Sequence, residues 1–185
     1  MQKTSLTHPL EIAPLATQPG CGRIGVTFCP GKYDPHAMTG AWARDLAVDL
    51  NAIRRWGAAA LVTLIEDWEL KKLRVEKLGT EARKLGLEWF HLPIVDGGVP
   101  ESNFECEWQV AGPSLLRFLS AGQDVVVHCK GGQGRAGTIA ALLLIEMGIS
   151  APEAILRVRR VRQGAIENRA QEKYLLSLSN KRGRD

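Results

Sequence analysis

Short apolar runs alternate with longer amphipathic segments along most of the chain. Residues 58–65 are apolar almost throughout, as expected of a central strand that is buried on both faces. Between residues 42 and 56, apolar side chains recur at helical spacing with charged residues between them, and the following Gly57 is a usual residue at a helix C-terminus. The pattern predicts strands over 23–28, 58–65, 87–92 and 124–128. It predicts helices over 42–56, 75–85, 104–119, 136–147, 152–162 and 168–179, and over 66–73 a loop that leads into a short helix.

Alternating strands and helices predict an α/β fold, with a central, mostly parallel sheet flanked by helices on both faces. Within the expected helix 104–119, Gly112 and Pro113 predict a break or kink. Residues 1–20 contain three prolines and little periodicity, so we expect an N-terminal arm that is extended and could be flexible. Residues 21–180 would then form one domain, followed by a basic tail over 181–185.

Composition excludes several other classes of protein. No apolar run reaches the roughly 20 residues that a membrane-spanning helix needs. The N-terminus has no continuous apolar segment of the kind found in secretory signals, and the four cysteines lack the spacing of a disulfide framework or a zinc site. The formal net charge of +4 is mild, so the basic clusters 157–162 and 181–184 are interpreted as solvated helix faces, and no nucleic-acid partner is expected.

The chemistry concentrates in residues 124–138. A β-branched run ends at His128, Cys129 follows at once, and Arg135 lies six residues after the cysteine. Glycines between them let the backbone curl so that its N–H groups turn inward and bind an anion of the size of phosphate. The same positive field favours the thiolate form of a cysteine at its centre, and the arginine fork suits two phosphoryl oxygens. The pattern therefore indicates a hydrolase of phosphate esters with Cys129 as nucleophile.

Other motifs fit this stretch less well. Residues 132–137 match GxGxxG, but no second strand ending in an acidic residue follows about 20 positions later, as a dinucleotide site requires. A nucleotide-binding P-loop would need a lysine before Thr138. A buried structural cysteine beside an unrelated arginine would leave the glycines unexplained.

Residues 128–135 resemble the HCxxxxxR loop of cysteine-dependent protein tyrosine and dual-specificity phosphatases, most of all the small kinase-associated and compact archaeal-type members. Residues 93–100 resemble the general-acid loop of that family, and residues 164–171 resemble a further motif. The resemblance implies catalysis through a phosphocysteine without a cofactor or metal. It implies phosphate binding by Lys130, Gly131, Gly132, Gln133, Gly134 and Arg135, and supporting roles for His128, Thr138 and Gln171, the last by helping to place the attacking water.

Expelling an alkoxide or phenoxide requires a proton donor, and Asp96 is our candidate. It lies just beyond the strand expected at 87–92, at the edge of the sheet where α/β active sites form. Asp124 opens the strand that leads to Cys129, so about five residues at ~3.3 Å each would hold it roughly 16 Å away. Asp67 and Glu69, which follow the strand expected at 58–65, are the reserve acids.

The sequence departs from the family at two positions. Most relatives carry Ser or Thr directly after the loop arginine, where its hydroxyl stabilises the departing thiolate, but this chain has Ala136, as in the slow regenerating-liver-type phosphatases. The resemblance therefore implies slow breakdown of the phosphocysteine. Several relatives also carry a partner cysteine near the end of the central strand, where this chain has Ile65 and Glu66; Cys29 could substitute.

Substrate predictions are broader. Lys130 is a feature of lipid phosphatases, but the second lysine of that pattern is replaced by Gln133. We expect a phosphorylated protein substrate, phosphotyrosine ahead of phosphothreonine or phosphoserine, with a phosphoinositide or small phosphate ester as the alternative. A phosphate-binding module without activity and a rhodanese-like sulfurtransferase are further alternatives. A nucleophilic cysteine needs a reducing compartment, so we expect a cytoplasmic protein, and we expect a monomer.

Overall fold

We describe residues 2–182 of the chain in a computed structural model. A five-stranded sheet has the order β1-β2-β7-β5-β6, and only its edge strand β1 runs antiparallel to its neighbour. The expected mostly parallel α/β sheet is confirmed. The strands of this sheet are β1 (Ala13–Leu15), β2 (Ile24–Phe28), β5 (Ala58–Thr63), β6 (Glu88–His91) and β7 (Asp124–Cys129).

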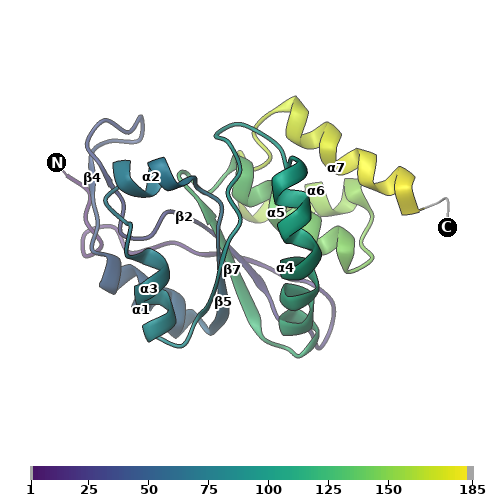
Figure 1. Cartoon of the computed structure of the whole chain (residues 1–185), viewed down its shortest axis with the longest axis horizontal. Helices are drawn as coiled ribbons and strands as arrows, with labels where there is room; N and C mark the ends of the chain where they lie inside the picture. Colours follow the sequence, from purple (N-terminus) through teal and green to yellow (C-terminus); the bar gives the residue numbers. More distant parts are fainter. Residues whose placement is uncertain (1, 183–185) are drawn as a thin grey trace.

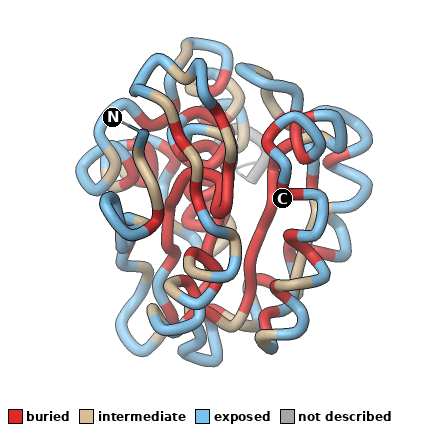
Figure 2. Tube along the Cα trace, turned by 90° about the vertical axis from the view of Figure 1, so that its left-hand side faces the viewer, coloured by how far each residue is buried: buried red, intermediate tan, exposed pale blue. Residues whose placement is uncertain are grey.

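Helices cover both faces of the sheet (Figure 1). One face carries α1 (Leu46–Trp56) and α3 (Leu78–Lys84), and the other carries α4 (Ser102–Ser120), α5 (Gly134–Glu146) and α6 (Ala151–Val161). Short α2 (Asp67–Lys72) follows β5, and α7 (Arg169–Arg182) packs on α5 and α6. The buried positions follow the strands and the inner faces of the helices, as the red segments of Figure 2 show. The central strand β7 is buried at every residue after Asp124 because helices lie on both of its faces.

The N-terminal segment contributes more to the fold than the sequence indicated. Residues 13–15, expected within an extended arm, pair with β2 as the strand β1, and Leu15 is buried. Lys3 pairs with the short hairpin formed by β3 (Tyr33–Asp34) and β4 (Trp42–Ala43), since its N–H and C=O bond to Ala41 and Ala43. A β bridge can form at single residues that carry no periodic pattern, which is why the hydrophobic pattern missed both contacts.

The helix expected over 42–56 starts later, and that boundary was wrong. Asp45 has extended backbone angles, and its side chain accepts a hydrogen bond from the N–H of Val48, which makes it the N-cap. Gly57 ends α1 in the left-handed conformation with φ of 104°, as expected. Trp42, which has helical spacing to Leu46, instead lies in β4.

Helix α4 runs without interruption through Pro113, so the predicted break is absent from residues 102–120. Proline removes one backbone hydrogen bond, and the neighbouring turns tolerate the loss. Helix α7 extends to Arg182, so the tail expected over 181–185 begins within a helix, and residues 183–185 lie outside the described part. Among residues 2–182, no helix is long and apolar enough to cross a membrane.

Candidate active site

The loop between β7 and α5 curls around the sulfur of Cys129. The Gly132 N–H donates to Cys129 Sγ over 3.2 Å, so at least one amide of the loop points at the sulfur. Gly132 has φ of 71°, and a Cβ there would lie 2.5 Å from the backbone of Phe28. Only glycine can therefore bring the loop this close to β2 and keep its N–H turned inward.

The carbonyls of the same loop point outward and are held by residues after α6. Arg162 donates from Nε to the Gly132 oxygen over 2.9 Å and from Nη2 to the Gly131 oxygen over 3.2 Å. The side chain of Gln133 donates to the carbonyl of Gln163 over 3.1 Å. With their carbonyls fixed on the outside, the peptide units of the loop turn their N–H groups toward the centre.

Helix α5 begins at Gly134 directly after this loop, and its positive end adds to the field there. A Cβ at Gly134 would overlap the carboxylate of Glu167, so a larger residue here would have to displace that side chain. Ala136 is fully buried in the first turn of the helix. The hydroxyl of Thr138 donates to the carbonyl of Gly134 within the same helix over 2.8 Å. Thr138 therefore does not offer its hydroxyl to Cys129 in this conformation.

Arg135 is held from below by Glu69, and both side chains are about 2% exposed or less. Arg135 Nη1 lies 2.6 Å from Glu69 Oε2 and Nη2 lies 2.9 Å from Oε1, which is a bidentate pair. Nη1 also donates to the carbonyl of Ile94 over 2.9 Å. Burial disfavours the charged guanidinium, but the Glu69 hydrogen bonds and nearby negative groups outweigh this and raise the pKa of Arg135 above its ordinary value. Glu69, a reserve acid on sequence grounds, is thus occupied in orienting Arg135.

Asp96 contacts the same guanidinium. Its Oδ1 lies 2.9 Å from Arg135 Nη2, and its side chain is 61% exposed. The structure thus brings together Cys129, Arg135 and Asp96 from three separate parts of the sequence. Asp67, the other reserve acid, is 86% exposed and lies near His91. Asp124 pairs with Arg23 at the opposite edge of the sheet, as its place at the start of β7 predicted.

The loop that carries Asp96 is anchored by the start of α7. Asn168 donates from its side chain to the carbonyl of Gly97 over 2.8 Å. Gln171 is fully buried; it donates to the carbonyl of Gly98 over 3.1 Å and accepts from the N–H of Glu167 over 3.0 Å. Gln171 is thus a buried residue, and residues 164–171 contact the acid loop directly.

His128 is a buried member of a hydrogen-bonded chain. Trp89 Nε1 donates to Thr63 Oγ1 over 2.8 Å, and that hydroxyl lies 2.8 Å from His128 Nε2. The other ring nitrogen lies 3.4 Å from the carbonyl of Cys129. The Thr63 hydroxyl accepts from Trp89, so its own proton is donated to His128 Nε2. We therefore place the proton of the neutral imidazole on Nδ1. Burial lowers the pKa of His128 to about 3, so it is a neutral scaffold residue that orients the Cys129 peptide.

The ammonium group of Lys130 lies near a carboxylate. Its Nζ lies 3.4 Å from Asp34 Oδ2, and Asp34 is buried. Cys29 comes directly after β2, whose last residue, Phe28, pairs with Cys129. The N–H of Cys29 donates to the carbonyl of Lys130 over 3.4 Å. Both cysteines are free thiols, and burial raises the pKa of Cys29. A resting Cys29 is therefore protonated at neutral pH.

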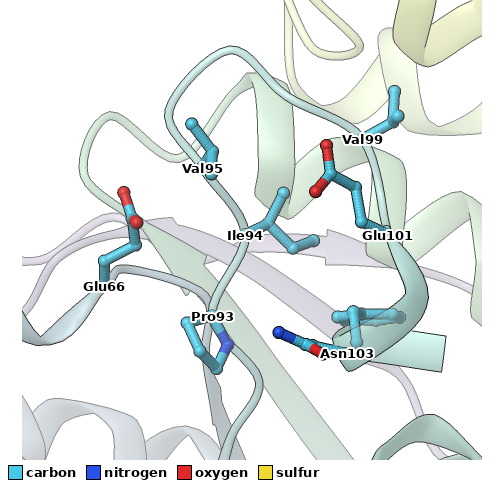
Figure 3. Close-up of a pocket in the computed structure, with 8 residues that line it drawn as sticks. Glu66, Pro93, Ile94, Val95, Val99, Glu101 and Asn103 are labelled. Atoms are coloured by element: carbon cyan, nitrogen blue, oxygen red, sulfur yellow. The ribbon is translucent and has the colours of Figure 1, made fainter. Parts of the chain in front are cut away.

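A cavity of about 190 Å³ lies between the acid loop and the start of α4 (Figure 3). Figure 3 shows Ile94 and Val95 along the loop, with Glu66 on one side and Glu101 on the other. No residue of 129–135 lines this cavity, so it is separate from the sulfur. Among the described residues, no group of three His, Cys, Asp or Glu side chains could hold a metal ion.

A family model described as "Swiss Army Knife protein, DSP-PTPase phosphatase domain" matches residues 34–175. The chain belongs to this phosphatase family. It is 32% identical over 140 residues to cyclin-dependent kinase inhibitor 3 of Mus musculus, covering 75% of this chain and 65% of that protein. It is 34% identical over 127 residues to protein tyrosine phosphatase type IVA 3 of Homo sapiens, covering 67% of this chain and 66% of that protein. The chain thus matches about two thirds of the length of these curated relatives.

Solved phosphatase structures resemble this chain in fold. The structure of kinase associated phosphatase with its catalytic cysteine replaced by serine superposes with a TM-score of 0.80 at 27% identity, covering 96% of this chain and 98% of that one. Tk-PTP in its active form gives a TM-score of 0.65 at 29% identity, covering 91% and 97%. The expected family and fold are confirmed.

Three contacts of the phosphatase domain were missed from sequence: those of Glu69, Arg162 and Asn168. Glu69 was considered only as an acid, and Arg162 was assigned to a solvated basic face. The resemblance of residues 164–171 to a family motif was the one available signal for Asn168. For Glu69, the signal was a carboxylate in the first turn of the helix after a central strand, at the same edge of the sheet as Arg135.

We predict that Glu69→Gln destabilises the phosphatase domain and lowers activity. Removing one charge of a buried pair leaves the guanidinium of Arg135 with only the exposed Asp96 as a charged partner, which costs about 3–5 kcal/mol. Urea unfolding monitored by tryptophan fluorescence measures the first effect, and kcat/KM for p-nitrophenyl phosphate measures the second. Glu66→Gln is the matched control on the same turn, because its carboxylate contacts Trp68 and not Arg135. Equal stability and activity in both variants would contradict the role of Glu69.

A second prediction concerns acid stability. The folded-state pKa of His128, about 3, lies below the ordinary value of 6.5, so the unfolded state binds the proton more readily. Its contribution to stability is present above pH 6.5 and is lost as the pH falls toward 3. Between pH 7.5 and pH 5, the free energy of unfolding should drop by about 2 kcal/mol from this residue. His128→Gln should remove that part of the pH dependence, and His36→Gln, at an exposed loop position, should leave it in place.

Proposed function

We propose that this domain hydrolyses phosphate monoesters on proteins through a phosphocysteine at Cys129, with phosphotyrosine preferred over phosphothreonine or phosphoserine. The observation that carries the proposal is the sulfur of Cys129 at the centre of a loop whose Gly132 amide points at it and whose Arg135 lies beside Asp96. The solved relative whose catalytic cysteine was replaced by serine supports the same role for Cys129.

The first step transfers the phosphoryl group to sulfur. The thiolate of Cys129 attacks phosphorus, the bond from phosphorus to the ester oxygen breaks, and Asp96 donates a proton to the departing oxygen. The loop amides and Arg135 stabilise the charge on the equatorial oxygens. Water then attacks phosphorus, the P–S bond breaks, and Asp96 takes a proton from that water.

Arg135 must exchange a partner for this chemistry. In the structure its Nη1 and Nη2 contact Glu69, Ile94 and Asp96. A bidentate phosphate needs Nη2 together with Nε, so substrate would displace Asp96 from Nη2. The released carboxylate remains at the mouth of the loop, where the leaving group sits. Glu69 stays bonded throughout and keeps the fork in position.

The charge around Lys130 favours a protein substrate over a phosphoinositide. Asp34 lies 3.4 Å from Lys130 Nζ and offsets its charge, and Gln133 stands where lipid phosphatases carry a second lysine. A pocket for an inositol polyphosphate would keep such cations available. The name of kinase associated phosphatase connects that relative with protein kinases. We further propose that the domain works as a monomer in the cytoplasm, since Cys129 needs a reducing compartment.

Replacing Cys129 by serine tests the proposed activity. Cys129→Ser should abolish vanadate-sensitive hydrolysis of p-nitrophenyl phosphate and of phosphotyrosine peptides, because a serine hydroxyl is a far poorer nucleophile here. Cys106→Ser, at an exposed position of α4, is the matched control and should retain full activity. Wild-type protein that binds phosphate but hydrolyses no ester would make the domain a binding module. Cyanide–thiosulfate sulfur transfer would make it a rhodanese-like enzyme.

Asp96→Asn tests the general acid. Loss of the proton donor should lower kcat for phosphotyrosine peptides by about 10²-fold or more, because that leaving group needs a proton. Turnover of p-nitrophenyl phosphate should fall much less, since p-nitrophenolate leaves without help. Asp67→Asn, on the exposed side of α2, should change neither substrate. An equal loss for both substrates in Asp96→Asn would assign Asp96 to another task.

Ala136 is expected to make phosphocysteine hydrolysis the slow step. The position is buried in the first turn of α5, and the nearby Thr138 hydroxyl bonds to Gly134 instead. Ala136→Ser should therefore raise kcat severalfold by stabilising the departing thiolate. Rapid-mixing kinetics should show a burst of product in the wild type and a smaller burst in the variant. A wild type without a burst would place the slow step elsewhere.

A further inference from the structure

A second cavity borders the catalytic loop, and Asp96 does not line it. It has a volume of about 530 Å³ and lies between the N-terminal segment, the β3–β4 hairpin and the loop. Its walls include Gly131 and Gln133 of the catalytic loop and the aromatic rings of Phe28 and Trp42. Nothing in the mechanism above uses this cavity.

Three cations line this second cavity, namely Lys3, Lys32 and Arg162. Each donates to neutral carbonyl oxygens: Lys3 to Thr39, Lys32 to Lys130, and Arg162 to Gly131 and Gly132. Within residues 2–182, no carboxylate lies within ion-pair distance of these three side chains. The one acid in the lining, Glu11, has an exposed side chain. Asp34, whose negative charge acts on Lys32, does not line the cavity. The wall of the cavity therefore carries three positive side chains against one exposed carboxylate.

Aromatic rings hold two of these ammonium groups in place. Lys3 Nζ lies 4.9 Å from the centroid of the Trp42 ring, and Lys32 Nζ lies 4.8 Å from the Phe28 ring and 4.9 Å from the Trp42 ring. Lys32 is only 5% exposed, and burial lowers its pKa. Burial has removed most of the water around the Lys32 ammonium group. An anion in the cavity would replace part of that solvation, so binding a negatively charged ligand here is favourable.

The contacts place this charge beside the phosphate loop. Lys32 bonds to the carbonyl of the residue directly after Cys129, and Arg162 bonds to the next two carbonyls. We propose that this cavity binds a second phosphate group carried by the same protein substrate, so that the domain prefers peptides phosphorylated at two neighbouring positions. The inference rests on the proposed function and adds its substrate class.

The test compares singly and doubly phosphorylated peptides. A phosphotyrosine peptide series with a second phosphoserine at each position from −3 to +3 is hydrolysed by the wild type and variants. For the peptide with the best-placed second phosphate, kcat/KM of the wild type should be about tenfold higher than for the singly phosphorylated peptide. A factor of this size is what one charge-assisted hydrogen bond contributes. Lys3→Glu should abolish that gain and leave p-nitrophenyl phosphate turnover unchanged. Lys3→Gln keeps a donor for the Thr39 carbonyl but removes the charge, so it should lose most of the gain.

Lys77→Glu is the matched control for the change in charge, because Lys77 is an exposed residue before α3 and does not line the cavity. It should keep the full preference. The proposal is overturned if no second phosphate improves the wild type, if Lys3→Glu keeps the gain, or if only soluble inositol bisphosphates show it. Calorimetric binding of the peptides to Cys129→Ser, with and without Lys3→Glu, gives the same comparison even if the domain hydrolyses nothing.

Discussion

The buried pair between Arg135 and Glu69 is the interaction on which the site depends. A guanidinium with almost no exposure would be costly without a carboxylate of matching geometry. Glu69 supplies that carboxylate from α2, and one of its oxygens also accepts the N–H of Glu66, which fixes the helix start. The pair thus joins the end of β5 to the start of α5. It sets the plane of the guanidinium before any substrate arrives, which is what electrostatic preorganisation requires.

The residues after α6 position both loops of the site. Arg162 holds the outward carbonyls of the catalytic loop, and Asn168 and Gln171 hold the carbonyls of the acid loop. Nucleophile and acid therefore share one support, although they are more than 30 residues apart in the sequence. A shared support keeps the distance between sulfur and carboxylate constant, and that distance decides whether the proton reaches the leaving group.

Local patterns in the sequence predicted the parts of the domain that depend on local physics. The β-branched run, the glycines and the Cys129-to-Arg135 spacing led to the catalytic loop, and the alternating elements led to the sheet. Contacts between distant residues were beyond such patterns. The place of Glu69 in the first turn after β5 indicated the edge of the sheet at which it lies, but not that its partner comes 66 positions later. The helical spacing of Trp42 was overridden by its pairing with Asp34 in the β3–β4 hairpin. Gly112 and Pro113 suggested a break or kink, but α4 continues as a helix through both residues.

The antiparallel strand β1 has a consequence for solubility of the folded chain. It covers the outer side of β2, which would otherwise expose a parallel edge with all its backbone donors and acceptors. The strand is three residues long, and its middle residue is Pro14, which has no N–H to offer. Such a short, proline-containing border is a poor template for another molecule's strand. The sheet is thereby protected from growing by edge-to-edge aggregation on that side.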